Sequence, residues 1–99
     1  MLPILSTTQA YVCMVLAAAP PEGLHGRAIL RVGGPEIKPG TIYATLLRLE
    51  GKGLLESTTF ATPQGERGPP RRVFRLTGDG RRALEAWQRR AQQGWVLPT

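Results

Sequence analysis

The sequence predicts a mainly α-helical domain with one small β-hairpin. Two short runs, residues 55–60 and 71–76, alternate as strands do, and the segment between them is rich in glycine and proline. Four other stretches carry apolar residues at helical spacing. The chain has 99 residues, 41% of them apolar and 20% charged, which is ordinary for one globular domain with a modest core.

The first helix is expected at residues 6–19. Ser6, Thr7 or Thr8 can cap its start, and prolines at positions 20 and 21 end it. This helix is apolar on almost every side, so we expect it to lie centrally in the core or against a partner. A second, shorter helix is expected at residues 23–32, with an inward face made of Leu24, Ala28, Ile29 and Val32.

The third helix is expected to begin near Pro39 or Gly40 and to run to Lys52. Proline fits a first helical turn, and Gly53 is a natural C-terminal stop. An apolar row, which consists of Ile42, Leu46 and Leu49, predicts the buried side. Beside it lies a row with hydroxyls and cations and no acid: Thr41, Thr45, Arg48 and Lys52.

The two alternating runs predict a hairpin with a long tip at residues 61–70. Thr77 then caps a last helix through about Gln93, and Asp79 in its first turn favours the helix dipole. Three helices followed by a two-stranded hairpin is the order of a winged helix-turn-helix. We therefore expect residues 1–77 to form that domain and residues 78–99 to form a C-terminal dimerisation helix and tail.

The positive charge of the chain lies in its last third. Residues 1–66 hold five Lys/Arg and five Asp/Glu, which cancel, whereas residues 67–99 hold eight arginines against two acids and supply the whole +6. Such a one-sided excess attracts polyanions, above all nucleic acid. A basic surface kept for solubility is the alternative.

In a winged helix, the third helix enters the major groove of double-stranded DNA, and the hairpin is the wing. The hydroxyls and methyls of Thr41 and Thr45 can read base edges, while cations hold the phosphates. An arginine-rich wing lies along the backbone or enters the minor groove. The residues predicted to contact DNA are Lys38, Thr41, Thr45, Arg48, Lys52, Arg67, Arg71 and Arg72. The alternatives are a plain amphipathic helix and a solvated basic loop.

Other classes of site are not indicated. The single Cys13 cannot form an internal disulfide and suits a reducing cytoplasm, and the apolar run at residues 10–19 is too short to span a bilayer. His25 has no companion ligands, so no metal site or cofactor is expected, and a helix cap is favoured over a pH-sensitive or ligand role. No nucleophile–base set or phosphate-cradling loop indicates an enzyme.

The last helix carries a narrow apolar stripe of Leu84, Trp87 and Ala91. A stripe this narrow suits one partner helix, and two-fold pairing would place two third helices about one DNA turn (~34 Å) apart on a palindromic site. The alternative is that Trp87 folds back on its own domain.

Two blocks carry a resemblance to a known family: Gly40-Thr41-Ile42-Tyr43 in the third helix, and Arg71-Arg72-Val73-Phe74-Arg75-Leu76-Thr77 in the hairpin. With His25-Gly26, Arg48-Leu49-Glu50, Gly53-Leu54-Leu55, Gly80 and Leu84, they resemble the PadR family of bacterial transcriptional regulators over residues 6–90. Departures from the family pattern include Arg27-Ala28 after the histidine-glycine pair, Ala44 after the tyrosine and Val73-Phe74 in the wing.

The resemblance implies a winged-helix homodimer of the short-tailed kind that represses a promoter and is released by an effector. It also implies that Tyr43 contacts the DNA backbone, although the helical wheel leaves packing inside the domain as an alternative. In some short members, the resemblance suggests, aromatic side chains at the dimer centre sandwich flat hydrophobic molecules. Trp87 and Trp95 are the candidates for that role, and the alternative is that both are packing residues.

The main hypothesis from the sequence is thus a sequence-specific, dimeric DNA-binding repressor. Its rival is a winged-helix module that uses the third helix or the wing to bind an acidic protein and has no preference among DNA sequences.

Overall fold

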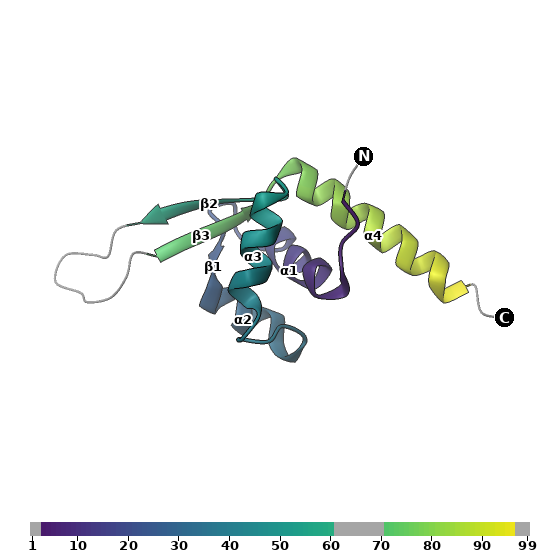
Figure 1. Ribbon diagram of the computed structural model, residues 1–99, viewed down its shortest axis with the longest axis horizontal. Coiled ribbons are helices and arrows are strands. Elements are labelled where there is room, and N and C mark those ends of the chain that lie inside the picture. Colours follow the sequence, from purple (N-terminus) through teal and green to yellow (C-terminus); the bar gives the residue numbers. More distant parts are fainter. Residues whose placement is uncertain (1–2, 61–70, 97–99) are drawn as a thin grey trace.

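The computed structural model describes residues 3–60 and 71–96 (Figure 1). Its elements, in order, are α1 (Thr7–Ala17), β1 (Leu24–His25), α2 (Gly26–Gly33), the 3₁₀ turn η1 (Gly34–Glu36), α3 (Ile42–Gly51), β2 (Leu55–Phe60), β3 (Arg71–Leu76) and α4 (Gly78–Val96). In Figure 1 the β2–β3 hairpin extends to one side of the helical core, and α4 leaves on the other. The architecture is mainly α with a small sheet, as the sequence predicts.

The sheet has three strands in the order β1-β3-β2, all antiparallel. The hairpin predicted from alternation is confirmed, with Leu55 opposite Leu76 at its root and Phe60 opposite Arg71 at its outer end. β1 was not predicted, because a run of two residues shows no periodicity. It pairs with the middle of β3, where Leu24 lies opposite Phe74.

Two of the predicted helix starts are confirmed by their capping bonds. The Ser6 Oγ accepts a hydrogen bond from the Gln9 backbone N–H, and the Gln9 side chain accepts one from the Ser6 N–H, which makes a capping box. At α4, the Thr77 Oγ1 accepts from the Gly80 N–H at 3.0 Å. These bonds satisfy backbone donors that a first helical turn leaves unpaired.

The second helix differs from its prediction in its start and in one inward residue. It begins at Gly26, because Leu24 and His25 form β1. Ala28 and Ile29 are buried as expected, but Val32 is 64% exposed, so its inward assignment was wrong. The chain reverses after this helix and brings Ile37, which is 3% exposed, against Gly33, and Ile37 closes this end of the core instead.

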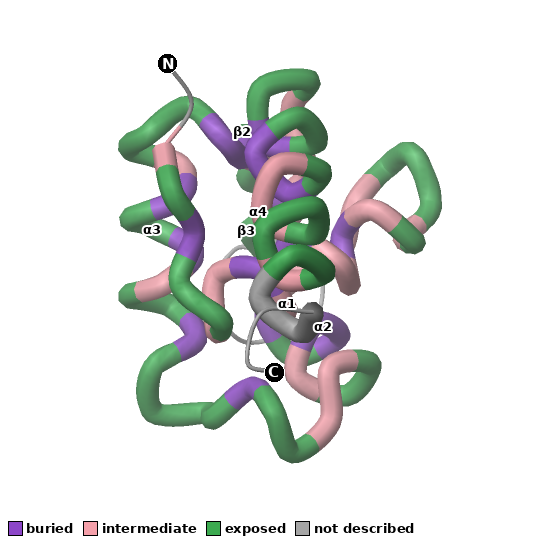
Figure 2. Tube along the Cα trace, turned by 90° about the vertical axis from the view of Figure 1, so that its right-hand side faces the viewer, coloured by how far each residue is buried: buried purple, intermediate pink, exposed green. Residues whose placement is uncertain are grey.

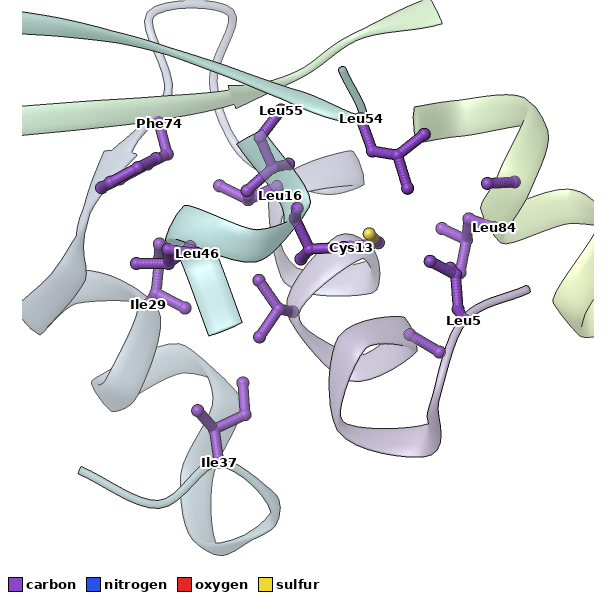
Figure 3. Close-up of a cluster of buried hydrophobic side chains, with 14 of the residues drawn as sticks. Leu5, Cys13, Leu16, Ile29, Ile37, Leu46, Leu54, Leu55, Phe74 and Leu84 are labelled. Carbon is purple, nitrogen blue, oxygen red and sulfur yellow. The ribbon is translucent and has the colours of Figure 1, made fainter. Parts of the chain in front are cut away.

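The core lies between α1, α3, the sheet and the first turns of α4. Figure 3 shows Cys13, Leu46 and Phe74 among the side chains that converge there, and each is at most 1% exposed. Burial raises the pKa of the Cys13 thiol to about 11, so this cysteine is a packing residue with little thiolate. In the described part of the chain, no helix has the length and apolar character that a membrane crossing requires.

Candidate nucleic-acid interface

Helix α3 presents one side to the core and the other to solvent. Ile42, Leu46 and Leu49 are buried, as predicted, and in Figure 2 the outer side of this helix is coloured as exposed. The solvent-facing residues, which we call the α3 ridge, are Thr41, Tyr43, Ala44, Leu47, Arg48, Gly51 and Lys52. Within the predicted hydroxyl-and-cation row, Thr45 is the residue that is half-buried.

A tight turn before α3 positions the start of the ridge. The Thr41 backbone N–H and its hydroxyl both donate to the Lys38 carbonyl oxygen, at 3.2 and 3.3 Å. The regular helix therefore begins at Ile42, later than the predicted Pro39 or Gly40. Lys38 and Thr41 are both exposed at this end of the helix, where a winged helix meets a groove.

Tyr43 lies across the beginning of α2 and is not part of the core. Its side chain is 55% exposed, and its ring approaches so closely that a Cβ at Gly26 would lie 2.7 Å from the Tyr43 Oη. The alternative in which Tyr43 packs inside the domain is therefore wrong. Leu47, 52% exposed on the same ridge, was not singled out from the sequence because an apolar residue at helical spacing is ordinarily assigned to the core.

The wing is joined to α3 by a closed set of hydrogen bonds, which we call the Glu50 bridge. The Arg72 Nη2 donates to the Glu50 Oε1 at 2.6 Å, and the Arg72 Nε donates to the Ser57 Oγ at 2.9 Å. The Ser57 Oγ in turn donates to the Glu50 Oε2 at 2.5 Å. The Arg72 guanidinium also lies 5.5 Å from the ring centre of the buried Phe74. Arg72, predicted as a free phosphate contact, therefore already holds a carboxylate.

The two adjacent wing arginines occupy opposite faces of the hairpin, because successive side chains of a strand alternate. Arg72 shares its face with Phe74 and so points to the α3 side. Arg71 shares its face with Val73 and Arg75, and Arg75 there pairs with Glu56 at 3.3 Å. The structure therefore brings Arg72 next to α3 and Arg71 to the other side. Arg67 lies outside the described residues.

His25 caps α2, as predicted. Its Nδ1 accepts a hydrogen bond from the Ala28 backbone N–H at 3.3 Å, which requires that this nitrogen carry no proton. Burial lowers the pKa of His25, and the positive charges of Arg71, Arg31 and Arg27 lower it further.

The cap predicts a stability loss in mild acid. The folded-state pKa of His25 lies below its ordinary value of 6.5, so the unfolded chain binds the proton more readily. The contribution of neutral His25 to the free energy of unfolding is thus fully present above about pH 6.5, and it is lost as the pH is lowered toward the folded-state pKa. We expect His25→Asn, which keeps an acceptor at the position of Nδ1 but does not titrate, to flatten this part of the curve. Urea unfolding at pH 5 and pH 7.5 measures it, and equal pH slopes in the two proteins would contradict the assignment.

The predicted dimerisation stripe on α4 divides between the core and the surface. Leu84 is 4% exposed and packs in the chain's own core, so it is not free to contact a partner helix. Trp87 and Ala91 are half-buried, and Trp87 packs against the edge of that core. The backbone of Trp95 lies in α4, and its side chain lies outside the described residues.

A hollow elsewhere in the fold is separate from this stripe. An open pocket of about 370 Å³ lies between the end of α1, the root of the hairpin and the first turn of α4. Glu56, Arg75 and Arg81 supply its charged lining, and Leu16 and Leu76 are among its apolar residues. None of Leu84, Trp87 and Ala91 lines it.

The sequence that forms this three-stranded winged helix matches a known family. A model of the "Transcriptional regulator PadR-like family" matches residues 15–86. The chain belongs to the PadR-like family. This is a family of transcriptional regulators and not of enzymes.

The chain is also similar to a named regulator and to solved structures. The transcriptional regulator Rv3488 of Mycobacterium tuberculosis is 47% identical over 51 residues, which cover 52% of this chain and 44% of that protein. The chain therefore spans less than half the length of this curated relative. A PadR-like transcription factor from Bacteroides fragilis is 26% identical, with a TM-score of 0.64 and coverage of 84% of this chain and 80% of that one. The PcaV transcriptional regulator of Streptomyces coelicolor is 31% identical, with a TM-score of 0.66 and coverage of 89% and 58%.

Proposed function

We propose that this chain is a sequence-specific DNA-binding transcriptional regulator that acts as a homodimeric repressor on a palindromic operator. The observation that carries the proposal is the Glu50 bridge. Its 2.6 Å ion pair joins α3 to β3 and brings Arg72 of the wing to the same side of the hairpin as the exposed α3 ridge, whereas Arg71 faces the other side. Membership of the PadR-like family supports the same function.

In this proposal α3 enters the major groove and the wing follows the backbone. Thr41 and Thr45 read base edges, Lys38, Arg48 and Lys52 bind phosphates, and Arg67, Arg71 and Arg72 supply the charge of the wing. Tyr43 binds a backbone phosphate in this proposal, which its exposure beside the first turn of α2 supports. Leu47 offers an apolar contact to a thymine methyl.

The dimer is proposed to form through α4, from Trp87 and Ala91 to the end of the helix at Val96. Leu84 is excluded from the contact, because it is buried in its own domain. Pairing of two such helices about a two-fold axis would set the α3 helices about 34 Å apart, one turn of DNA.

A small hydrophobic or aromatic effector is proposed to release the DNA. Trp87 and Trp95, on the proposed pairing helix, are the candidates to stack against it. Support comes from a relative, since PcaV of Streptomyces coelicolor has been crystallised in complex with its natural ligand.

The deciding experiment is selection of duplexes from a random pool, followed by footprinting of the enriched sequence. We expect an enriched palindrome, protected symmetrically over two half-sites, and at least about a thousandfold weaker binding to a shuffled duplex. Symmetric protection supports the dimer, and protection of one half-site would contradict it.

The second candidate function is a protein-interaction module. The half-exposed Tyr43 and Leu47 on the α3 ridge favour it, because exposed apolar side chains also suit a protein partner. In that case the selection would enrich no sequence, and palindromic and shuffled duplexes would bind alike.

Substitutions on α3 separate base reading from phosphate binding. Arg48→Ala is expected to weaken binding to all duplexes by a similar factor and to lower the salt slope by about one. Thr45→Ala is expected to change preference at a few base pairs, by about 1–3 kcal/mol each. Binding to a panel of single-base operator variants measures both. A uniform loss in both proteins would contradict the assigned roles.

A further inference from the structure

We propose that Glu50 is a positioning residue for DNA binding, which holds the wing at a fixed place relative to α3 through Arg72 and Ser57. The proposal rests on the proposed function. It assigns to an acidic residue beside the DNA-facing surface a favourable effect on binding, although its charge alone repels the duplex.

The Glu50 bridge is a closed structure in which every member has two partners. Both carboxylate oxygens of Glu50 are engaged, one by Arg72 and one by Ser57, and Arg72 also bonds to Ser57. The three residues come from the last turn of α3, from β2 and from β3. One carboxylate therefore fixes both strands of the hairpin to the helix.

The Glu50 bridge packs against a residue of the hydrophobic core. The Arg72 guanidinium lies over the ring of Phe74, which is 1% exposed and packs in the core. Ser57 lies opposite Phe74 in the strand register. The Glu50 side chain is 25% exposed and that of Arg72 is 45% exposed, so the pair is only partly screened by water. The planar guanidinium bonds to two acceptors at once, which restricts direction as well as distance.

Two possible effects of Glu50 predict opposite changes in DNA affinity when its side chain is removed. If Glu50 acts only through its charge, its removal raises the affinity for DNA and steepens the salt dependence, because Arg72 becomes free to bind a phosphate. If Glu50 positions the wing, its removal lowers the affinity, because the wing must then be ordered when DNA binds. The sign of the change therefore decides between them.

The first test measures the affinity of Glu50→Ala and Glu50→Gln for a duplex enriched by the wild-type protein. We expect Glu50→Ala to bind about 3- to 10-fold more weakly, and Glu50→Gln, which retains an acceptor for Arg72, to lie between it and wild type. The matched control is Glu56→Ala, which also removes one carboxylate. Glu56 is next to Ser57 in β2 but lies on the opposite face of the hairpin, where it pairs with Arg75. Equal or tighter binding by Glu50→Ala would overturn the proposal.

A double-mutant cycle tests whether Glu50 acts through Arg72. In the positioning role, Glu50→Ala weakens binding less once Arg72→Ala has been made than it does in the wild-type protein, because only the bond to Ser57 is then left to lose. Independent contributions would instead add, and additivity would contradict the proposal.

A measurement without DNA separates this proposal from the proposed function. Amide hydrogen exchange along β2 and β3 is expected to be faster in Glu50→Ala than in Glu56→Ala, by about tenfold at the outer half of the hairpin, while exchange in α1 stays unchanged. If no duplex can be enriched but exchange changes in this way, the proposed function fails and the positional effect of Glu50 stands. Unchanged exchange would overturn the positioning role.

Discussion

The affinity of the protein for its operator is expected to fall by about 10³–10⁵ between 50 and 200 mM salt. This is the loss for a protein that neutralises roughly 6–10 phosphates, because each neutralised phosphate releases condensed counterions. In the proposed homodimer, two copies of the α3 ridge and of the wing would supply enough cations for contacts of this number. Fluorescence anisotropy with a labelled operator, titrated at five or six salt concentrations, measures the slope.

A shuffled duplex is the control for this titration. Its binding is expected to be weaker at every salt concentration and to show a similar slope, because phosphate contacts are largely independent of sequence. A slope that corresponds to fewer than about two phosphates would contradict the proposed interface and favour a protein partner.

The second large effect concerns the fold itself. Phe74→Ala is expected to lower the free energy of unfolding by about 3–5 kcal/mol, because it empties the site of a fully buried aromatic ring at the centre of the sheet. That loss is a large share of the stability of a domain of this size, about 5–15 kcal/mol. Urea denaturation followed by circular dichroism measures it.

Phe60→Ala provides the matched control, since the same side chain is removed from the outer end of β2, where it is 51% exposed. We expect this variant to lose no more than about 1 kcal/mol. Equal losses in the two variants would show that the core is not centred on Phe74.

Much of the fold could be predicted from the sequence because its signals are local. The hairpin bounds follow from alternation over six residues in each strand, and the starts of α1 and α4 follow from Ser6 and Thr77, whose side chains cap the next turn. The buried face of α3 follows from the spacing of Ile42, Leu46 and Leu49. Each of these signals involves residues that are close together in the sequence.

The rest depends on contacts between distant residues. β1 has two residues and exists because β3 pairs with it. Val32 was assigned to the core by spacing, but the chain reversal that brings Ile37 to Gly33 cannot be seen in helical spacing. The Glu50 bridge joins residues 22 positions apart in sequence, and each of its members alone looks like an ordinary surface residue.

The candidate interface could be predicted only in part, because its geometry also depends on contacts between residues distant in the sequence. Composition locates the arginines but does not say which of two neighbours faces α3. Strand alternation assigns Arg72 to the α3 side only once the burial of Phe74 is known. The exposure of Leu47 was missed because apolar spacing identifies core residues better than it identifies apolar residues on a binding surface.

The short strand β1 pairs with only part of the hairpin, so the number of paired strands differs along the wing. Beside Val73 and Phe74 the hairpin has a third strand, which leads directly into α2 and so ties this part of the hairpin to the helix-turn-helix. Beyond Val73, the described hairpin continues with two strands, at the pairs Thr59–Arg72 and Phe60–Arg71. In this outer half the hairpin is held to α3 by the Glu50 bridge through Arg72, so a duplex whose curvature differs from one promoter to another would displace mainly the end of the hairpin at Phe60 and Arg71.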